Sequence, residues 1–321
     1  MIIKALDLIK SDKKILNSFQ EKFKYILVDE FQDVNNLQVE LLKLLSPRSS
    51  LFCVGDDWQS IYGFRGSNVD VIIEFGKHFE NARTIKLNLN YRSTNQIVGA
   101  SNEVIRNNKH IVDKEISSIK VSNDGIHIHA GSCEEENVEF VIEQLRELND
   151  DGYSREDILI LYRRSKMFDP YMKRLKTENL AVSGKTIHAS KGLEAKVVFI
   201  IGLSEGSGGF PNVWMDDRIF QVIKESDHDQ LMEEERRLFY VAMTRAKEQL
   251  YLITEKGGES IFINEVPEEF TEKSEKPLKP VVEKIYLCSQ CGTKLEDHYS
   301  YCPFCGHNRK LKNLGTTGEV D

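Results

Sequence analysis

The feature that most constrains the fold is an apolar run that ends in two adjacent carboxylates. Residues 25–28 are apolar, and Asp29 and Glu30 follow them directly. A short apolar run bounded by polar residues is typical of a strand buried on both faces of a parallel sheet. Ligands of such sheets bind beyond the carboxyl ends of the strands, where these two acids would emerge. The simpler alternative is a strand followed by a solvated acidic turn.

The composition indicates a globular protein of about two domains, with 321 residues, 40% of them hydrophobic and 29% charged. No apolar stretch approaches the roughly 18 residues of a membrane span. The N-terminus also lacks a signal-peptide profile. We therefore predict a cytoplasmic protein with no membrane partner. The net charge of −8 argues against a uniformly basic surface but allows a local basic groove.

Strands alternate with helices along most of the chain. Strands are predicted at residues 25–28, 51–54, 84–89, 126–129, 158–162, 182–187, 197–201 and 249–254. Helices are predicted at residues 1–24, 35–45, 94–107, 134–148, 165–177 and 231–247. This alternation favours an α/β fold with parallel sheets. The polar residues 108–124 resemble a linker, and the charged, proline-bearing residues 265–280 resemble a tether.

Five segments resemble, in order, the motifs of UvrD/Rep-type superfamily 1 DNA helicases. They are Asp29-Glu-Phe-Gln-Asp33, Gly55-Asp-Asp-Trp-Gln-Ser-Ile-Tyr-Gly-Phe-Arg-Gly66, Asn90-Tyr-Arg-Ser93, Thr186-Ile-His-Ala-Ser-Lys-Gly-Leu-Glu194 and Glu233-Glu-Glu-Arg-Arg-Leu-Phe-Tyr-Val-Ala-Met-Thr-Arg-Ala246. The resemblance implies two RecA-like parallel-sheet domains and an ATP-dependent DNA helicase. We expect a partial first domain at 1–107, a second at 108–260, a charged linker at 261–284 and a zinc ribbon at 285–312.

The resemblance assigns seven residues to ATP and Mg²⁺. Asp29 would hold the metal and Glu30 would activate the attacking water, roles that suit adjacent carboxylates. The other assignments are Gln59 as γ-phosphate sensor, Tyr91 as adenine-stacking ring, Arg92 as phosphate contact, Glu194 as ribose contact and Arg245 as arginine finger. A guanidinium suits the last role because it keeps its charge.

The DNA side is assigned to four further residues. Phe64 resembles the family's base-stacking aromatic, and stacking of this kind tolerates any base sequence. Arg65 and His188 are candidates for backbone contacts with single-stranded DNA. Lys191 is either a phosphate contact or part of a solvated turn. Trp58 and Tyr62 could share the stacking or simply pack, and packing is favoured for Trp58. By resemblance, translocation on the strand would run 3′ to 5′.

The family's phosphate-binding loop has no match in these 321 residues. No segment fits Gly-x-x-x-x-Gly-Lys-Ser/Thr, whose lysine and amides hold the β- and γ-phosphates. We expect a chain truncated before the acidic motif, with an uncovered sheet edge and no ATPase activity alone. A partner chain carrying the missing N-terminal part would complete the site. The alternative is a non-catalytic DNA- or partner-binding remnant. The short span from Ser93 to Thr186 lacks the large insertion of many relatives, as in the helicase IV-like branch.

The C-terminal region carries two cysteine pairs. Cys288 and Cys291 form the first and Cys302 and Cys305 the second, and a glycine follows each pair. This spacing predicts a structural zinc ribbon with four thiolate ligands for Zn²⁺. The alternatives are disulfides, which are disfavoured in a cytosolic chain, or a redox pair, which two matched pairs disfavour.

Overall fold

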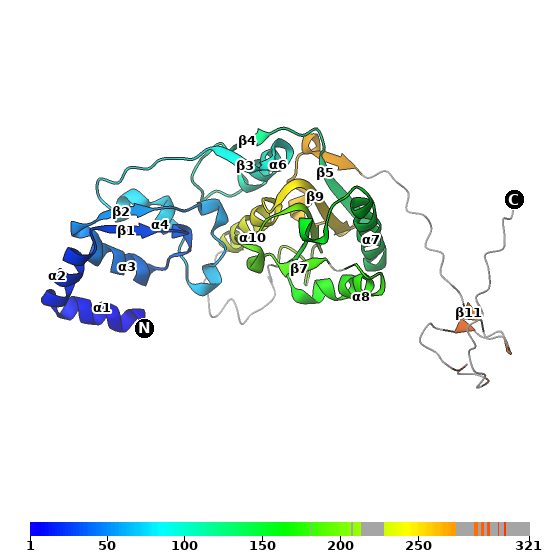
Figure 1. Cartoon of the computed structure of the whole chain (residues 1–321), viewed down its shortest axis with the longest axis horizontal. Helices are drawn as coiled ribbons and strands as arrows, with labels where there is room; N and C mark the ends of the chain where they lie inside the picture. The colour runs from blue at the N-terminus through cyan, green and yellow to red at the C-terminus, as the bar shows by residue number, and fades with distance from the viewer. Residues whose placement is uncertain are drawn as a thin grey trace. The chain divides into compact units, whose positions relative to one another are not determined.

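The structure is a computed structural model of the whole chain (Figure 1). It describes residues 1–180, 182–206, 208–212 and 228–273, together with residues 286–287, 290–291, 294–295, 301 and 305. The chain divides into two compact units, Met1–Ser274 and Glu275–Asp321. No helix of the described residues is long and apolar enough to cross a membrane.

A parallel six-stranded sheet is the centre of the first unit. Its strands are β5 (Ile126–Gly131), β6 (Ile158–Tyr162), β7 (Ser183–Thr186), β8 (Ala195–Ile201), β9 (Ala246–Glu255) and β10 (Thr271–Lys273). They lie in the order β10-β5-β9-β8-β6-β7, and every neighbouring pair is parallel. The predicted α/β class with parallel sheets is confirmed.

Helices cover both faces of this sheet, because alternate strand residues point to opposite sides. One face packs Leu159, Leu161 and neighbouring apolar residues against α6 (Asn95–Ile105), α10 (His228–Met243) and α11 (Ile261–Asn264). On the opposite face, the ring of Phe140 from α7 (Glu134–Asp150) stacks on that of His129, with centroids 3.8 Å apart. Helix α8 (Asp169–Thr177) packs beside α7.

Two segments pack differently from their predicted places. Helix α6 was expected in the first domain, yet Ile97, Ala100 and Val104 lie in the core of the six-stranded sheet. Residues 261–273 were expected in the charged linker. They form α11 and β10 instead, with Phe262 buried and β10 paired with β5. The charge and prolines around this segment hide two short elements from sequence analysis, of which α11 buries Phe262 and Ile263 and leaves Ile261 exposed.

A smaller parallel pair lies near the N-terminus. It consists of β1 (Tyr25–Val28) and β2 (Ser50–Cys53). The helices around it are α1 (Ile2–Ser11), α2 (Lys13–Lys22), α3 (Asn36–Leu45), α4 (Asp70–Ile73) and α5 (Phe75–His78). The predicted single helix over 1–24 is two helices, since Asp12 ends α1 and accepts hydrogen bonds from Lys14 and Ile15 at the start of α2. Asn35 caps α3, in a capping box with Gln38.

The prediction that β1 is buried on both faces is wrong for this structure. The pair packs one face against a small cluster that includes Phe31, Val39 and Val71. On the other face, Leu27 is 75% exposed and Phe52 is 60% exposed. In the described structure β1 pairs only with β2, so an apolar sequence typical of a central strand lies at the surface.

The third predicted strand begins later than expected. Residues 84–88 form no strand, and Ile85 and Leu87 are exposed. Strand β3 (Leu89–Thr94) instead contains the Asn90–Ser93 motif and pairs in parallel with β4 (Ser117–Lys120). The predicted linker at 108–124 is therefore partly strand, because polar residues such as Ser118 pair through their backbone and not through apolar side chains.

Short 3-10 helices complete the first unit, at 31–33, 46–48, 57–59, 63–65, 155–157, 165–168, 188–190 and 268–270. In the second unit, β11 (Tyr286–Leu287) pairs antiparallel with β12 (Lys294–Leu295). Of the four predicted zinc ligands, Cys288 and Cys302 lie outside the described residues. Cys291 and Cys305 are described and exposed. Among the described residues no group of three His, Cys, Asp or Glu side chains could hold a metal.

Candidate functional site

The two carboxylates of the acidic motif follow β1 directly, as the sequence predicted. Glu30 has a φ of 50° in the left-handed region, which is uncommon for a residue other than glycine. Its backbone N–H donates to Asp29 Oδ1 at 2.9 Å. Strained backbone of this kind is concentrated at functional sites. The two adjacent carboxylates have different partners, since Asp29 Oδ1 accepts from the Glu30 N–H and Glu30 Oε2 accepts from Gln32.

A chain of polar contacts joins Glu30 to the segment after β2. Gln32 donates through Nε2 to Glu30 Oε2 at 2.5 Å, and its Oε1 accepts the Asp56 N–H at 2.9 Å. Asp56 Oδ2 accepts a hydrogen bond from Gln59 Nε2 at 2.7 Å. The Gln59 amide therefore presents its oxygen to the other side, where Arg245 Nη2 lies 3.4 Å away. The predicted water-activating acid, sensor and finger thus belong to one network.

Arg245 is almost fully buried, at 2% exposure. Its Nε donates to Val241 O at 2.9 Å and its Nη1 to Leu193 O at 3.2 Å. Burial, and next the nearby Arg92, lower the pKa of Arg245 to about 10. The guanidinium therefore stays charged at neutral pH, and its backbone partners fix it in the direction of Gln59.

Arg92 and Glu194 form the next part of the site. Arg92 Nε lies 2.6 Å from Glu194 Oε2, and Lys247 Nζ lies 2.6 Å from Glu194 Oε1. The hydrogen bond from Lys247, and next that from Arg92, hold the pKa of Glu194 below its usual value. Tyr91 directly precedes Arg92 in sequence, and its side chain is exposed to solvent. Two cations, Arg92 and Lys247, therefore pair with one carboxylate, and Arg245 lies near Arg92, a charge balance that suits a polyanion.

Lys191 does not face solvent. Its side chain is 10% exposed, and its Nζ lies 2.6 Å from Asp33 Oδ2 and 3.1 Å from Glu30 Oε2. It also donates to Gln59 O at 3.2 Å. The structure therefore pairs the Lys191 ammonium with the acidic motif, at the side of the Tyr62 ring.

The other predicted DNA contacts gather around the 3-10 helix Gly63–Arg65. Phe64 is 60% exposed, and its ring lies 5.3 Å from that of His188 in an edge-on arrangement. The Arg65 guanidinium lies 4.8 Å from the ring centroid of Tyr62. Trp58, by contrast, is completely buried against Ile105 and Tyr240, as favoured from the sequence. An exposed aromatic beside a cation fits a surface on which bases stack.

The 3-10 helix Gly63–Arg65 is joined to α10 by a hydrogen bond from its backbone. The Gly63 N–H donates to Glu234 Oε1 at 2.9 Å, and a Cβ at Gly63 would lie 2.6 Å from Glu234 Oε2. A side chain at Gly63 would therefore require the Glu234 carboxylate to move. Burial, and next the charge of Arg163, lower the pKa of His188 to about 4. His188 is consequently neutral at pH 7 and would contact DNA as a hydrogen-bonding group and not as a cation.

Sequence reasoning missed several residues that shape the site. Lys114, in the predicted linker, pairs with Asp56 and, at 2.7 Å, with Asp57, and its side chain is 13% exposed. Its Nζ lies 4.5 Å from the Trp58 ring centroid. No sequence signal distinguishes Lys114 from other lysines of that segment. Gln32 and Lys247 lie inside or next to recognised motifs, so motif position could have indicated them.

The acidic motif fits Mg²⁺ in the manner usual for that ion. Magnesium is commonly bound by one or two carboxylates together with substrate phosphates and waters. Asp29 and Glu30 supply such a pair, and the described residues contain no larger cluster that would enclose a metal by itself. Asp29 would hold the ion, and the bound ion would supply charge neutralisation for a phosphate.

The last three letters of a phosphate-loop pattern do occur, at Gly184-Lys185-Thr186, but Asn179 stands where the first glycine is required. This triplet lies within strand β7 and not in a loop before a helix. Its backbone belongs to an edge strand paired with β6 and not to a loop at a helix N-terminus, where phosphate groups bind.

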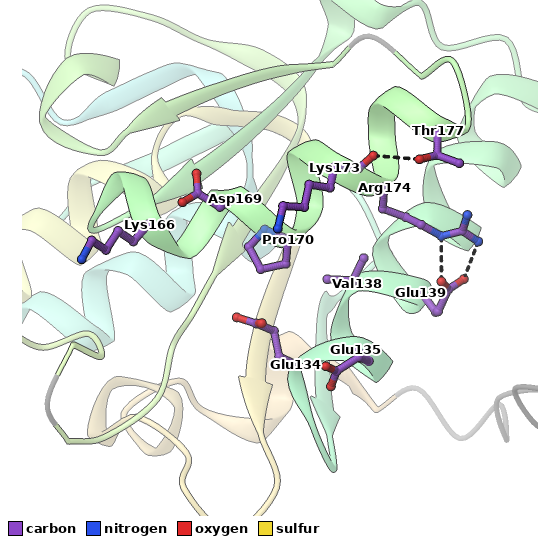
Figure 2. A pocket seen from close by; sticks show the side chains of 10 residues that line it. All are labelled: Glu134, Glu135, Val138, Glu139, Lys166, Asp169, Pro170, Lys173, Arg174 and Thr177. Atoms are coloured by element: carbon purple, nitrogen blue, oxygen red, sulfur yellow. Dashed lines mark hydrogen bonds and ion pairs between the residues drawn. The ribbon is translucent and has the colours of Figure 1, made fainter. Parts of the chain in front are cut away.

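A separate groove lies between α7 and α8 (Figure 2). Its walls carry both charge signs, and Arg174 donates to Glu139 at 2.8 and 3.1 Å. None of its lining residues belongs to the predicted site. Arg174 and Glu139 pair within the groove, and nothing in it indicates a ligand.

Comparison with known protein families agrees with the motif order. Residues 1–80 match the UvrD/REP helicase N-terminal domain. Residues 85–185 and 181–257 match the UvrD-like helicase C-terminal domain. The two matches together include every predicted nucleotide and DNA contact.

Individual relatives are helicases of bacteria. A probable DNA helicase of Mycoplasma pneumoniae is 34% identical over 264 residues, which are 79% of this chain and 48% of the relative. DNA helicase IV of Escherichia coli is 33% identical over 252 residues, 76% of this chain and 36% of the relative. The ATP-dependent DNA helicase PcrA of Staphylococcus aureus is 39% identical over 164 residues, 51% of this chain and 22% of the relative.

The chain thus spans about half the length, or less, of these relatives. The match to the C-terminal domain alone covers more than half of the residues of this chain. Together with the order of the motifs and the network from Glu30 to Arg245, these matches lead to one assignment. The chain belongs to the UvrD/REP helicase family.

Proposed function

We propose that this chain carries the motor core of an ATP-dependent translocase on single-stranded DNA, moving 3′ to 5′. The network from Glu30 through Gln32, Asp56 and Gln59 to Arg245 supports this proposal best. It joins the predicted water-activating acid to a charged guanidinium 215 sequence positions later. A γ-phosphate bound between Glu30 and Arg245 would contact residues of the first and of the last of the five motifs.

The segment from Gln59 to Phe64 would couple ATP hydrolysis to DNA binding. Gln59 and Phe64 are five residues apart, and both lie on short 3-10 helices after β2. Gln59 faces Arg245, whereas Phe64 faces His188 and solvent. A change of phosphate state at Gln59 would therefore move a segment that also carries the base-stacking ring. Asp29, Tyr91, Arg92 and Glu194 would hold Mg²⁺ and the nucleotide.

We further propose that the 321 residues need a phosphate loop supplied by another polypeptide segment. Phosphoryl transfer depends on positioning and on electrostatic stabilisation, and the loop supplies much of both. The exposed apolar face of β1 and β2 supports this view, because a further strand and its helix would cover it. The C-terminal cysteines would form a separate zinc ribbon as an accessory contact.

The test is ATP hydrolysis with and without a complementing polypeptide. The purified 321-residue chain should show no DNA-stimulated hydrolysis above background. Co-expression with the N-terminal part of a relative that carries the phosphate loop should restore it. Glu30→Gln should abolish the restored activity, and Glu40→Gln, at a residue of α3 that pairs with Lys10 of α1, should leave it unchanged.

The alternative function, a DNA-binding remnant without catalysis, predicts a different result. Single-stranded DNA would bind, but no complementing segment would restore hydrolysis. Robust turnover by the 321-residue chain alone, lost on Glu30→Gln, would instead show that other groups hold the phosphates.

A further inference from the structure

Lys191 was expected to contact either DNA or solvent, yet its ammonium lies among oxygen atoms of Glu30, Asp33 and Gln59. Asp33 Oδ2, Glu30 Oε2 and Gln59 O lie 2.6, 3.1 and 3.2 Å from Nζ. An ammonium group has three N–H donors. Asp33 Oδ2 and Gln59 O accept hydrogen bonds from two of them, and Glu30 Oε2 is an ion-pair partner beside them, so the ammonium is directed at the acidic motif and not at a DNA phosphate.

The surroundings of Lys191 also separate it from solvent. Its side chain is 10% exposed, and the Tyr62 ring centroid lies 5.3 Å from Nζ. Asp33, its nearest partner, is 19% exposed. A lysine and a carboxylate at this depth interact more strongly than a surface pair, because less water screens them.

One of the three partners has a second proposed task. Glu30 is the carboxylate beside Asp29, and it has to be available to an attacking water when nucleotide and metal are bound. In the present arrangement its Oε2 accepts from Gln32 and lies beside Lys191. A divalent cation placed at Asp29 and Glu30 would meet a positive charge about 3 Å from the same oxygen.

We propose that Lys191 is the built-in counter-cation of the acidic motif. In the absence of metal it neutralises Glu30 and Asp33, and it competes with a divalent cation for the Glu30 carboxylate. This inference rests on the proposed function for the identity of the metal site. Lys191 is a positioning residue in this role, since it acts on the reaction through Glu30.

Lys191 lies three residues after His188 and three before Glu194. DNA that binds at His188 would shift residues 188–194. This shift would move the Lys191 ammonium away from Glu30 and free the Glu30 carboxylate. Displacement of Lys191 would thereby couple occupation of the DNA surface to metal binding at the acidic motif.

The test is the affinity of the 321-residue chain for Mn²⁺, measured by calorimetric titration without nucleotide. Lys191→Met removes the competing charge, so the dissociation constant should fall by about tenfold. Lys191→Arg should stay within a factor of about two of the unaltered chain. Lys196→Met provides a matched control, because Lys196 pairs with Asp157 at 3.1 Å and not with the acidic motif. Adding Glu30→Gln to Lys191→Met should remove the gain.

Oligonucleotide binding provides an independent readout. Lys191→Met should leave unchanged the dependence of single-strand affinity on salt, whereas a lost phosphate contact lowers that slope by about 0.7. Unchanged Mn²⁺ affinity in Lys191→Met, or a reduced salt slope, would overturn the inference. If Lys191→Met does not fold, as judged by circular dichroism, Lys191→Gln gives the same comparison while keeping a donor for Gln59 O. Absence of DNA binding by the unaltered chain would count against the proposed function and would leave the Mn²⁺ comparison intact.

Discussion

Phe64 is the residue on which base stacking can be tested directly. Its ring is largely exposed and touches His188 at its edge, so removing it disturbs little of the core. Phe64→Ala should weaken binding of a single-stranded oligonucleotide by about 1–3 kcal/mol. Fluorescence anisotropy measures this effect, and Phe64→Trp should retain the affinity. An unchanged affinity in Phe64→Ala would transfer the stacking role to Tyr62 or remove it.

His188 should make stability depend on pH. Burial lowers its pKa from 6.5 to about 4, so between these values the unfolded chain binds more protons than the folded one. The stability due to neutral His188 is therefore fully present above pH 6.5 and is lost as the pH falls towards 4. After allowance for partial solvent screening, the loss between pH 7 and 5.5 should be about 1 kcal/mol.

Urea unfolding of the unaltered chain and of His188→Gln at both pH values isolates this contribution. The variant should lose less stability on acidification than the unaltered chain. Some pH dependence should remain, because burial also lowers the pKa values of His127 and His129. Equal losses in the two proteins would contradict the neutral, buried state of His188.

At the scale of elements, the β1–β2 pair presents an apolar face that a further element would cover. Leu27 and Phe52 lie on it at matching positions of the parallel register. Exposed strand faces and edges favour association between chains. Leu27→Lys with Phe52→Lys should therefore raise the concentration at which the chain begins to aggregate, with a change in unfolding free energy of about 0.5 kcal/mol or less per site.

Light scattering against protein concentration measures this effect. Leu8→Lys serves as the control, because Leu8 is also exposed but lies on α1 and not on the sheet face. The double variant should also fail to respond to the complementing polypeptide. Equal aggregation of the control and double variants would show that the sheet face is not the associating surface.

At the scale of the whole molecule, the C-terminal unit should behave as a separate zinc-dependent module. Four thiolates at zinc-ribbon spacing leave no open coordination position, which is typical of a structural site. We expect one zinc per chain by elemental analysis of reduced protein. Cys288→Ser should lower zinc content and unfold this unit, while the thermal transition of Met1–Ser274 should remain unchanged. A full complement of zinc in Cys288→Ser would exclude that cysteine as a ligand.

The sequence by itself determined the parallel α/β class, most element boundaries in the large sheet and the order of the motifs. These succeeded because apolar runs such as Val197–Ile201 become central strands, and because Asn35 carries a local capping signal. It also placed Glu30, Gln59 and Arg245 in one functional group by resemblance, and their side chains are linked in space.

Only the tertiary structure decided how single side chains are used. Lys191 and Lys114 look like ordinary lysines in sequence, yet each is enclosed by carboxylates from a distant segment. Leu27 lies in a run typical of a buried strand but is exposed, since burial depends on which elements pack against a strand. Local sequence specifies backbone preference and apolar character, whereas burial and ion pairing arise between residues far apart in the chain, and these are fixed only when the chain folds.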